Sequence, residues 1–169
     1  MAFIHDIISI FERLGALILS IFFGPNTQSR RLQTAHEVLH AYSTLSVNNI
    51  LRPLDDSTFK QQILPASLGM PARSKDEFSK HAAGITSVFS DFRMEPQQIY
   101  EDEVQNAVII YAKMIGTLTK GLGAWENECV MIMKFSTDGR RVTSLQEFVD
   151  SAKAKLMKEK MAPKNFEQT

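Results

Sequence analysis

Hydrophobic and polar positions between residues 104 and 149 follow the pattern of β-strands. The first expected strand, Val104–Leu118, is rich in β-branched residues, and the second, Trp125–Phe135, places apolar side chains at alternate positions. A third strand is expected at Arg141–Val149. Glycine-bearing turns at Thr119–Gly123 and Asp138–Gly139 separate the three. The pattern predicts an antiparallel meander with one very apolar face, which needs a cover.

The rest of the chain can supply that cover as helices. Apolar residues recur at helical spacing in several segments, and Ser74 with Glu77 forms a capping box, which begins a helix. Helices are expected at Met1–Phe23, Ser29–Leu45, Val47–Leu51, Ser74–Phe89 and Ser151–Lys160, and further strands at Phe59–Leu64 and Phe92–Tyr100. This order predicts an α+β fold with helices packed on one face of an antiparallel sheet.

Asn127 interrupts the apolar face of the second strand, and the register of the last hairpin decides which side chains join it. A two-residue turn at Asp138–Gly139 would pair Phe135 with Val142. That register places on the Asn127 face Ser144, Gln146, Phe148 and Asp150. A three-residue turn with a left-handed bulge at Gly139 would instead place there Thr143, Leu145 and Glu147. Hydrophobicity slightly favours the first register, and the pattern leaves both open.

The connection between the first two strands raises the same question for Tyr111. A five-residue connection through Thr119–Gly123 would bring Tyr111 and Lys113 to the face that carries Asn127. We therefore expect Tyr111 to contribute to a pocket on that face.

Composition narrows the possible functions. With 169 residues, 44% of them hydrophobic and 22% charged, the chain suits one globular domain. Nineteen basic and nineteen acidic residues cancel, which argues against a nucleic-acid partner. The single cysteine, Cys129, excludes an intramolecular disulfide and indicates a reducing compartment such as the cytoplasm. Phosphate-binding loops, nucleophile elbows and metalloprotease motifs are absent from the sequence.

The apolar segment Met1–Phe23 contains only Asp6, Glu12 and Arg13 as charged residues. Its uninterrupted part is shorter than the ~20 residues needed to span a bilayer, and it lacks the cationic start of a signal peptide. Packing on the domain or on a dimer partner is favoured over contact with the surface of an internal membrane. Residues 1–26 are therefore expected to form an N-terminal extension.

Several side chains on the covered side could serve a pocket. Tyr42 lies on the apolar face of its helix and needs a hydrogen-bond partner, and His81 falls between apolar residues on the capped helix. Arg52 could hold an anion at a pocket rim, although a surface ion pair with a nearby aspartate is the simpler interpretation. His36 and His40 are one helical turn apart, but no acidic or cysteine residue nearby completes a metal site.

Three stretches resemble a known family: RRLQTAHEVLHAYSTLS, the segment from LRPLDDSTF to SVFSDF, and GAWENECVMIMKFSTDGRRVTSLQEFVDS. They are similar to the fungal SnoaL-like enzymes of polyketide, meroterpenoid and indole-alkaloid pathways. The resemblance covers roughly residues 29–160 and implies a cone-shaped, curved antiparallel sheet with N-terminal helices over its concave face. It implies a SnoaL-like domain at residues 27–160 and leaves 161–169 as a tail.

Carried over position by position, the resemblance implies pocket roles for Arg52 of LRP, for Trp125, Asn127 and Cys129 of WENEC, and for Glu147 of EFVD. This favours the bulged register of the last hairpin. Tyrosines are common in the family where this sequence has Trp125 and Cys129, so Trp125 is expected to be a stacking wall. Members of this superfamily work without metal or organic cofactor.

The chemistry expected of such a site is acid/base catalysis. A carboxylate that faces an apolar cavity has a raised pKa, which suits Glu147 for proton transfer near neutral pH. Asn127 could hold a developing oxyanion, Arg52 could compensate charge, and His81 could carry a second proton. The expected substrate-binding residues are Trp125, Cys129, Tyr42, Tyr111, Phe78, Phe89 and Met131.

The function implied is that of a cofactor-independent isomerase, cyclase or dehydratase acting on a hydrophobic polycyclic intermediate of fungal secondary metabolism. The alternative is a non-catalytic module of the same fold that binds a ligand or dimerises. In that case Met131, Met133 and Phe135 would fill the concave face. A homodimer through the outer face of the sheet is expected because Ala107–Thr117 is apolar on both faces.

Overall fold

The computed structural model describes residues 28–161, and the side chains of residues 28–156. The helix expected at Met1–Phe23 and the tail after residue 161 lie outside this range. Within it, no helix is long and apolar enough to cross a membrane.

One six-stranded sheet forms the framework, with the strand order β2-β1-β6-β5-β4-β3. Adjacent strands of the sheet are antiparallel except for β1 and β6, which are parallel to each other. The strands are β1 (Lys60–Leu64), β2 (Arg73–Ser74), β3 (Phe89–Asp102), β4 (Ala107–Leu118), β5 (Gly123–Phe135) and β6 (Val142–Val149). The parallel pair and the short strand β2 were not expected from the sequence.

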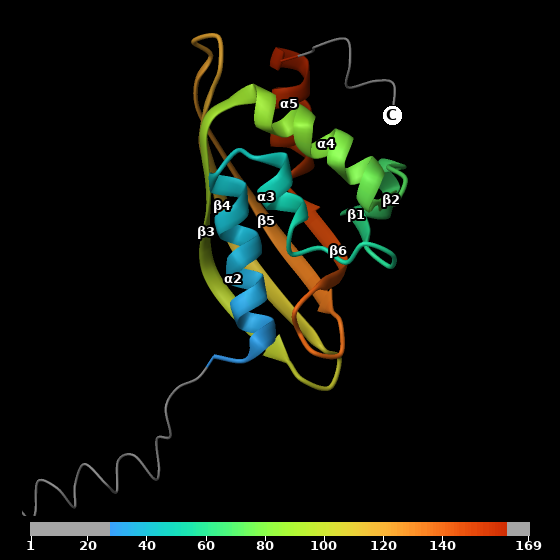
Figure 1. Cartoon of the computed structure of the whole chain (residues 1–169). Coiled ribbons are helices and arrows are strands. Elements are labelled where there is room, and N and C mark those ends of the chain that lie inside the picture. The colour runs from blue at the N-terminus through green and yellow to red at the C-terminus, as the bar shows by residue number, and fades with distance from the viewer. Residues whose placement is uncertain (1–27, 162–169) are drawn as a thin grey trace, which may run out of the picture.

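Helices cover the concave side of this sheet, as the sequence and its resemblance predicted. Figure 1 shows α2, α3 and α4 together on one side of the strongly curved strands. The helices are α2 (Arg30–Ser43), α3 (Val47–Leu51), α4 (Lys75–Val88) and α5 (Ser151–Met161), with a single 3-10 turn, η1, at Ala66–Leu68. The observed architecture is the predicted α+β fold.

Serine caps explain where the covering helices begin. The side chains of Ser29 and Ser46 accept hydrogen bonds from backbone amides in the first turns of α2 and α3. Ser74 and Glu77 form the predicted capping box, in which each side chain accepts a bond from the backbone of the other. These local signals define the helix starts without tertiary contacts.

The edge strand β3 is longer than the predicted Phe92–Tyr100, because it begins directly after α4 at Phe89. Its pairing with β4 shifts between Phe89 and Asp91 and again between Pro96 and Gln98. Proline cannot donate to a ladder, and an edge strand with a bulge is where it is tolerated. The irregular pairing accompanies the strong bend of β3 in Figure 1.

A bulge in β6 decides which of its side chains face the helices. Phe135 pairs with Val142, as the two-residue turn predicted, but Lys134 then pairs with Ser144, so Thr143 is an extra residue. Beyond this bulge Met131 pairs with Glu147. The register that places Glu147 on the Asn127 face is therefore confirmed, but the bulge lies at Thr143 rather than at Gly139.

Contacts from a distant loop explain the position of the bulge. The Val142 amide donates to the Pro53 carbonyl at 2.9 Å, and its carbonyl accepts from the Asp55 amide at 2.9 Å. Val142 is fully buried. Thr34 of α2 also donates to the carbonyl of Gly139 at 2.7 Å, so the hairpin tip is held against α2. These are tertiary contacts, which hairpin chemistry alone does not contain.

The connection between β4 and β5 corrects the position expected for Tyr111. Leu118 pairs with Gly123, which leaves four connecting residues instead of five. A change of one residue turns every side chain of a strand to the other face. Met114 therefore lies opposite Asn127, while Tyr111 pairs with Val130 on the outer face and hydrogen-bonds to Glu128.

Close packing between β3 and β4 leads to a first prediction, at Gly116. A Cβ atom there would lie 2.7 Å from the Asp91 carbonyl oxygen and 2.8 Å from the Phe89 ring. Because a backbone atom is one of the obstacles, Gly116→Ala is expected to destabilise the fold by about 1–3 kcal/mol. Denaturant unfolding should show a lower midpoint than for Thr117→Ala, a control on the other face. An unchanged midpoint would contradict this packing.

The outer face of the sheet leads to a second prediction, a homodimer. This face carries the half-buried apolar side chains of Ile109, Ile115, Val130 and Ile132, and Phe148 is 50% exposed. Ile132 lies between Ile109 and Gln146 at its centre. We expect light scattering to show a dimer at micromolar concentration and Ile132→Lys to make it monomeric.

The matched control for the dimer is Gln97→Lys, which adds the same charge at the bulge of the edge strand β3 and should leave the dimer intact. A wild-type protein that is monomeric under these conditions would contradict the expectation.

Candidate active site

A cavity of about 550 Å³ lies between the sheet, α4, α5 and the end of α2. Its few polar lining groups include Glu147, Asn127, Tyr42 and His81. Apolar side chains surround them, among them Ile63, Ile85, Phe92, Met94, Met114 and Val149. The volume is within the range of small-molecule sites, and the sparse polar groups are typical of such sites.

Glu147 reaches this cavity from β6. It is half-buried, and its Oε2 atom accepts a hydrogen bond of 2.6 Å from Nε2 of Gln61. Burial raises the pKa of Glu147, while the hydrogen bond from Gln61, the charge of Arg73 and the hydrogen bond from Tyr42 counteract that rise. A carboxylate with a raised pKa is a stronger base than an exposed one and can exchange a proton with a substrate.

Tyr42 comes from the last turn of α2 and hydrogen-bonds to Glu147. The side chain is 6% exposed. Burial and the charge of Glu147 raise the pKa of Tyr42 well above its ordinary value. The hydroxyl therefore stays protonated and acts as a donor, which is the pocket role the sequence proposed for it.

Asn127 lies on the cavity wall and is 1% exposed. Its Oδ1 accepts from the Glu128 amide at 2.8 Å, and its Nδ2 donates to the Asp150 carbonyl at 3.4 Å. An amide group has two N–H bonds, so Asn127 can offer a second one to a ligand. Asn127 also ties β5 to the beginning of α5, because Asp150 caps that helix through the amides of Ala152 and Lys153.

His81 faces the cavity from α4 and is half-buried, with its ring 6.1 Å from that of Phe78. Burial, and after it the charge of Arg73, lower the pKa of His81 to about 4. The imidazole is therefore neutral at physiological pH. It can hydrogen-bond to a ligand, but it is a weak base for the proton transfer that the sequence suggested.

Aromatic rings form one wall of the cavity. The Trp125 and Phe89 rings are 5.2 Å apart, and the Phe92 ring lies 4.9 Å from Phe89 and 6.2 Å from Tyr42. Tilted pairs at these distances hold one another in place. Trp125 and Phe89 therefore line the cavity, as the sequence predicted.

The structure does not bring all expected residues to the cavity. Arg52 is exposed at the end of α3, and Tyr111 lies on the outer face of β4. Phe78, Cys129 and Met131 are on the covered side but are at most 3% exposed within the core, and none lines the cavity. They lie behind it because neighbouring side chains cover them. Burial and the charge of Glu147 raise the pKa of Cys129 to about 12, which keeps its thiol protonated.

Sequence reasoning missed the two polar residues behind Glu147, which are Gln61 and Arg73. Gln61 shares a face of the expected strand with Phe59 and Ile63, so it interrupts an apolar face as Asn127 does. That signal could have revealed it. Arg73 immediately precedes the capping box and has no distinctive pattern around it.

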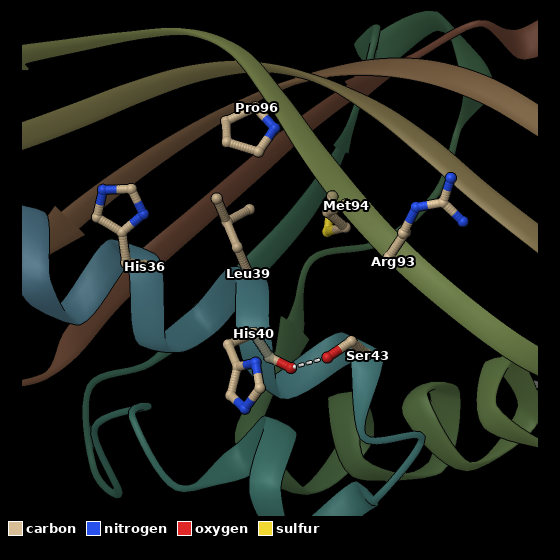
Figure 2. A pocket seen from close by; sticks show the side chains of 7 residues that line it. All are labelled: His36, Leu39, His40, Ser43, Arg93, Met94 and Pro96. Carbon is tan, nitrogen blue, oxygen red and sulfur yellow. Dashed lines mark hydrogen bonds between the residues drawn. The ribbon is translucent and has the colours of Figure 1, made fainter.

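A shallower hollow of about 370 Å³ lies between α2 and the edge strand β3, lined by His36, His40 and Arg93 among others. Figure 2 shows that the rings of His36 and His40 do not point toward one another. The Arg93 guanidinium is engaged by Glu95 at 2.7 Å. Among the described residues, no group of three His, Cys, Asp or Glu side chains is placed to hold a metal ion.

Curated relatives match part of the chain. The monooxygenase dmxR10 of a Cryptosporiopsis species is 33% identical over 98 residues, 58% of this chain and 64% of the relative. Monooxygenase AgnL5 of Paecilomyces divaricatus is 33% identical over 94 residues, 56% of this chain and 57% of the relative. The chain thus spans about three fifths of the length of these relatives.

A longer match is to the austinoid biosynthesis cluster protein H of Aspergillus calidoustus. It is 26% identical over 132 residues, 76% of this chain and 88% of the relative. No protein-family model matches the chain.

Solved structures of similar shape cover most of the chain. BvnE pinacolase from Penicillium brevicompactum has a TM-score of 0.74 at 18% identity, covering 82% of this chain and 94% of its own. AusH from Aspergillus nidulans has a TM-score of 0.68 at 24% identity, with coverages of 75% and 88%. An NTF2-like protein from Burkholderia pseudomallei has a TM-score of 0.61 at 14% identity, with coverages of 78% and 97%. The chain therefore has the NTF2-like cone fold that its resemblance to SnoaL-like proteins implied, and it shares this fold with AusH and BvnE.

Proposed function

We propose that this chain is a tailoring enzyme of fungal secondary metabolism that transforms a hydrophobic polycyclic substrate by proton transfer to and from Glu147. The observation that carries the proposal is a carboxylate that faces an apolar cavity of about 550 Å³ and is held by hydrogen bonds from Gln61 and Tyr42. Such a group combines a raised pKa with a defined orientation, which general acid/base catalysis requires.

The names of similar proteins support an enzymatic role of this kind. One relative is called an austinoid biosynthesis cluster protein, two are called monooxygenases, and one structural neighbour is a pinacolase. Three of these names describe enzymes and the fourth a biosynthetic cluster.

In the proposed reaction Glu147 takes a proton from a carbon or hydroxyl group of the substrate. The negative charge that develops on a substrate oxygen is stabilised by the second N–H bond of Asn127. The Tyr42 hydroxyl can turn to that oxygen once Glu147 is protonated. Glu147 then returns the proton at a different position. Isomerisation, cyclisation and dehydration all follow this sequence and differ in which bond the anion forms or breaks.

Orientation of the substrate comes from the apolar wall. Trp125, Phe89 and Phe92 offer ring faces and edges against which a flat, fused-ring substrate can stack. Holding one conformer against Glu147 converts a slow encounter into an intramolecular reaction. Neutral His81, on the α4 side, can hydrogen-bond to a polar substituent and select the substrate's orientation.

Oxygen insertion is a second candidate reaction, favoured by the relatives that are called monooxygenases. Removal of a proton from an electron-rich phenolic ring by Glu147 would produce an anion that is more reactive toward molecular oxygen. The two candidates differ in their products, because an isomerase leaves the mass of the substrate unchanged. In the oxygenation the substrate itself would supply the two electrons, so the product gains one oxygen atom and loses two hydrogen atoms, and the second oxygen atom of O2 leaves as water. Mass spectrometry of the product separates them.

A non-catalytic module is disfavoured by where the core residues lie. Met131, Met133 and Phe135 are buried in the core, and none of them lines the cavity that this alternative required them to fill. The cavity around Glu147 and Asn127 is open to a ligand. A half-buried carboxylate in an apolar cavity costs stability, and such costs are typical of functional sites.

The central prediction concerns turnover of a polycyclic pathway intermediate. Glu147→Gln preserves size but cannot exchange a proton, so we expect kcat to fall by about 10²-fold or more while the protein remains folded. Product formation can be followed by chromatography against the spontaneous reaction. Glu126→Gln, the same change at an exposed site on the outer face of β5, is the matched control. Full turnover by Glu147→Gln would exclude Glu147 as the acid/base.

A separate prediction concerns stability and pH. Folding raises the pKa of the Glu147 carboxyl group, so the folded protein binds the carboxyl proton more tightly than the unfolded chain does. The free energy of unfolding therefore falls as pH rises from the unfolded pKa to the folded pKa. Glu147→Gln has no charge to bury, so at pH 7 we expect it to melt at least about 2 °C higher than wild type.

The advantage of Glu147→Gln should vanish below about pH 4, where the glutamate is neutral in both states. The lowered pKa of His81 makes the fold lose stability as pH falls from about 6.5 to about 4. Both proteins contain His81, so its contribution cancels in the difference between their melting temperatures. A difference in melting temperature that is constant with pH would contradict the assignment.

A further inference from the structure

Two polar side chains are buried behind the cavity without lining it. Gln61 is 0% exposed and Arg73 is 8% exposed, and they are cross-strand partners in β1 and β2. Gln61 also pairs with Leu145 of β6, two residues before Glu147, so it lies on the same face as the carboxylate. Burying an arginine and an amide costs free energy unless both are hydrogen-bonded, so their placement calls for an explanation.

Hydrogen bonds join these residues to Glu147 in one direction. Arg73 donates from Nη1 to Oε1 of Gln61 at 2.9 Å, and Gln61 donates from Nε2 to Oε2 of Glu147 at 2.6 Å. A guanidinium only donates, so the amide oxygen of Gln61 must face Arg73. The NH₂ end of Gln61 must then face Glu147. Arg73 thereby excludes the flipped amide, which would set one oxygen against another.

This orientation has a chemical consequence for Glu147. Its Oε2 already accepts the N–H bond of Gln61, so a proton bound to Glu147 is favoured on Oε1, the oxygen that does not face this donor. The hydrogen bond from Gln61 is stronger when the carboxylate is charged, because charge-assisted bonds are stronger than neutral ones. The arrangement therefore opposes the effect of burial, which favours the neutral acid.

We propose that Gln61, held in one orientation by Arg73, is a positioning residue for Glu147. It favours the charged form of Glu147, and when Glu147 is protonated it directs the proton to Oε1. Its relevance to turnover rests on the proposed role of Glu147 as acid/base. The positive charge of Arg73 lowers the pKa of Glu147 and also polarises the amide that donates to it, while Arg73 itself stays out of the cavity. A neutral group next to the carboxylate leaves Glu147 able to accept a proton, whereas a direct ion pair would make it a much weaker base.

Other polar groups line the cavity together with Glu147 or interact with it electrostatically. Tyr42, His81, Asn127 and Lys155 line the cavity, and Cys129 lies behind it. Of these, Tyr42 donates to Glu147, while the Cys129 thiol stays protonated. The effect of Gln61 is therefore best measured with these side chains left unchanged.

The direct test is the pKa of Glu147 in the full chain without substrate. Carbon-13 NMR of the glutamate carboxyl carbons gives this value, and the spectrum of Glu147→Gln identifies the signal. Gln61→Leu removes the donor, and we expect the pKa of Glu147 to rise by about one to two pH units. The matched control is Gln62→Leu on the neighbouring residue, which pairs with Gln146 and faces the other side of the sheet. An unshifted Glu147 in Gln61→Leu would overturn the proposal.

A nearly isosteric variant guards against loss of folding. Gln61→Glu keeps an oxygen toward Arg73 but presents a second oxygen to Oε2 of Glu147. The two carboxyl groups would then share a proton, and the pair should titrate at higher pH than Glu147 does in wild type. A folded Gln61→Glu protein whose titration is not raised would show that the two side chains are not in contact, and this result by itself would also overturn the proposal.

A double-variant cycle tests whether Arg73 acts through Gln61. Arg73→Met should raise the pKa of Glu147 in the wild-type background, and Arg73→Lys, which can still donate to the amide, should restore it in part. In the Gln61→Leu background the effect of Arg73→Met should be clearly smaller. Equal effects in both backgrounds would mean that Arg73 acts only through space, which would overturn the relay.

Turnover separates this proposal from the proposed function. If Glu147 is the base, the acid limb of the pH–rate profile should move to higher pH in Gln61→Leu by the same amount as the NMR pKa. A shift seen by NMR with an unmoved rate profile would support the relay and exclude Glu147 as the base.

Discussion

A single extra residue in β6, Thr143, places the carboxylate on which the candidate site depends. Without this bulge, the Phe135–Val142 pair would direct Gln146 and Phe148 toward the helices and Glu147 toward the outer face. The bulge is held by two backbone hydrogen bonds between Val142 and the loop that follows α3. A loop far away in the sequence thus determines the orientation of every side chain in the second half of β6.

The sheet then divides its concave face into two regions. One region contains large apolar side chains such as Met133 and Leu145, which are at most 1% exposed and supply the stabilising core. The other region, around Asn127 and Glu147, contains the cavity, which α4 and α5 help to enclose. The hydrophobic effect is strong in the first region, and this allows the second to contain a cavity with a partly buried carboxylate.

Electrostatics within the cavity is a balance between burial and hydrogen bonding. Burial alone would leave Glu147 neutral, whereas a direct ion pair with Arg73 would leave it permanently charged. The structure places an amide between the two charges. This arrangement allows Glu147 to gain and to lose a proton, and Tyr42 adds a hydrogen-bond donor that remains protonated.

The sequence by itself determined the elements of this fold. Serine caps, the capping box at Ser74 and alternating strands are local signals, so α3 was predicted at its observed bounds and the strands β4 to β6 to within a few residues. The alternating pattern also singled out Asn127, and resemblance to known proteins selected the register that brings Glu147 beside it. Only the tertiary structure decided which side chains share the cavity. Strand side chains alternate with a period of two, so one residue more or less in a turn or a bulge reverses the face, and long-range contacts fix that number. For this reason Tyr111 and Arg52 lie away from the site, and Gln61, which pairs with a strand more than eighty residues further along the chain, lies beside it.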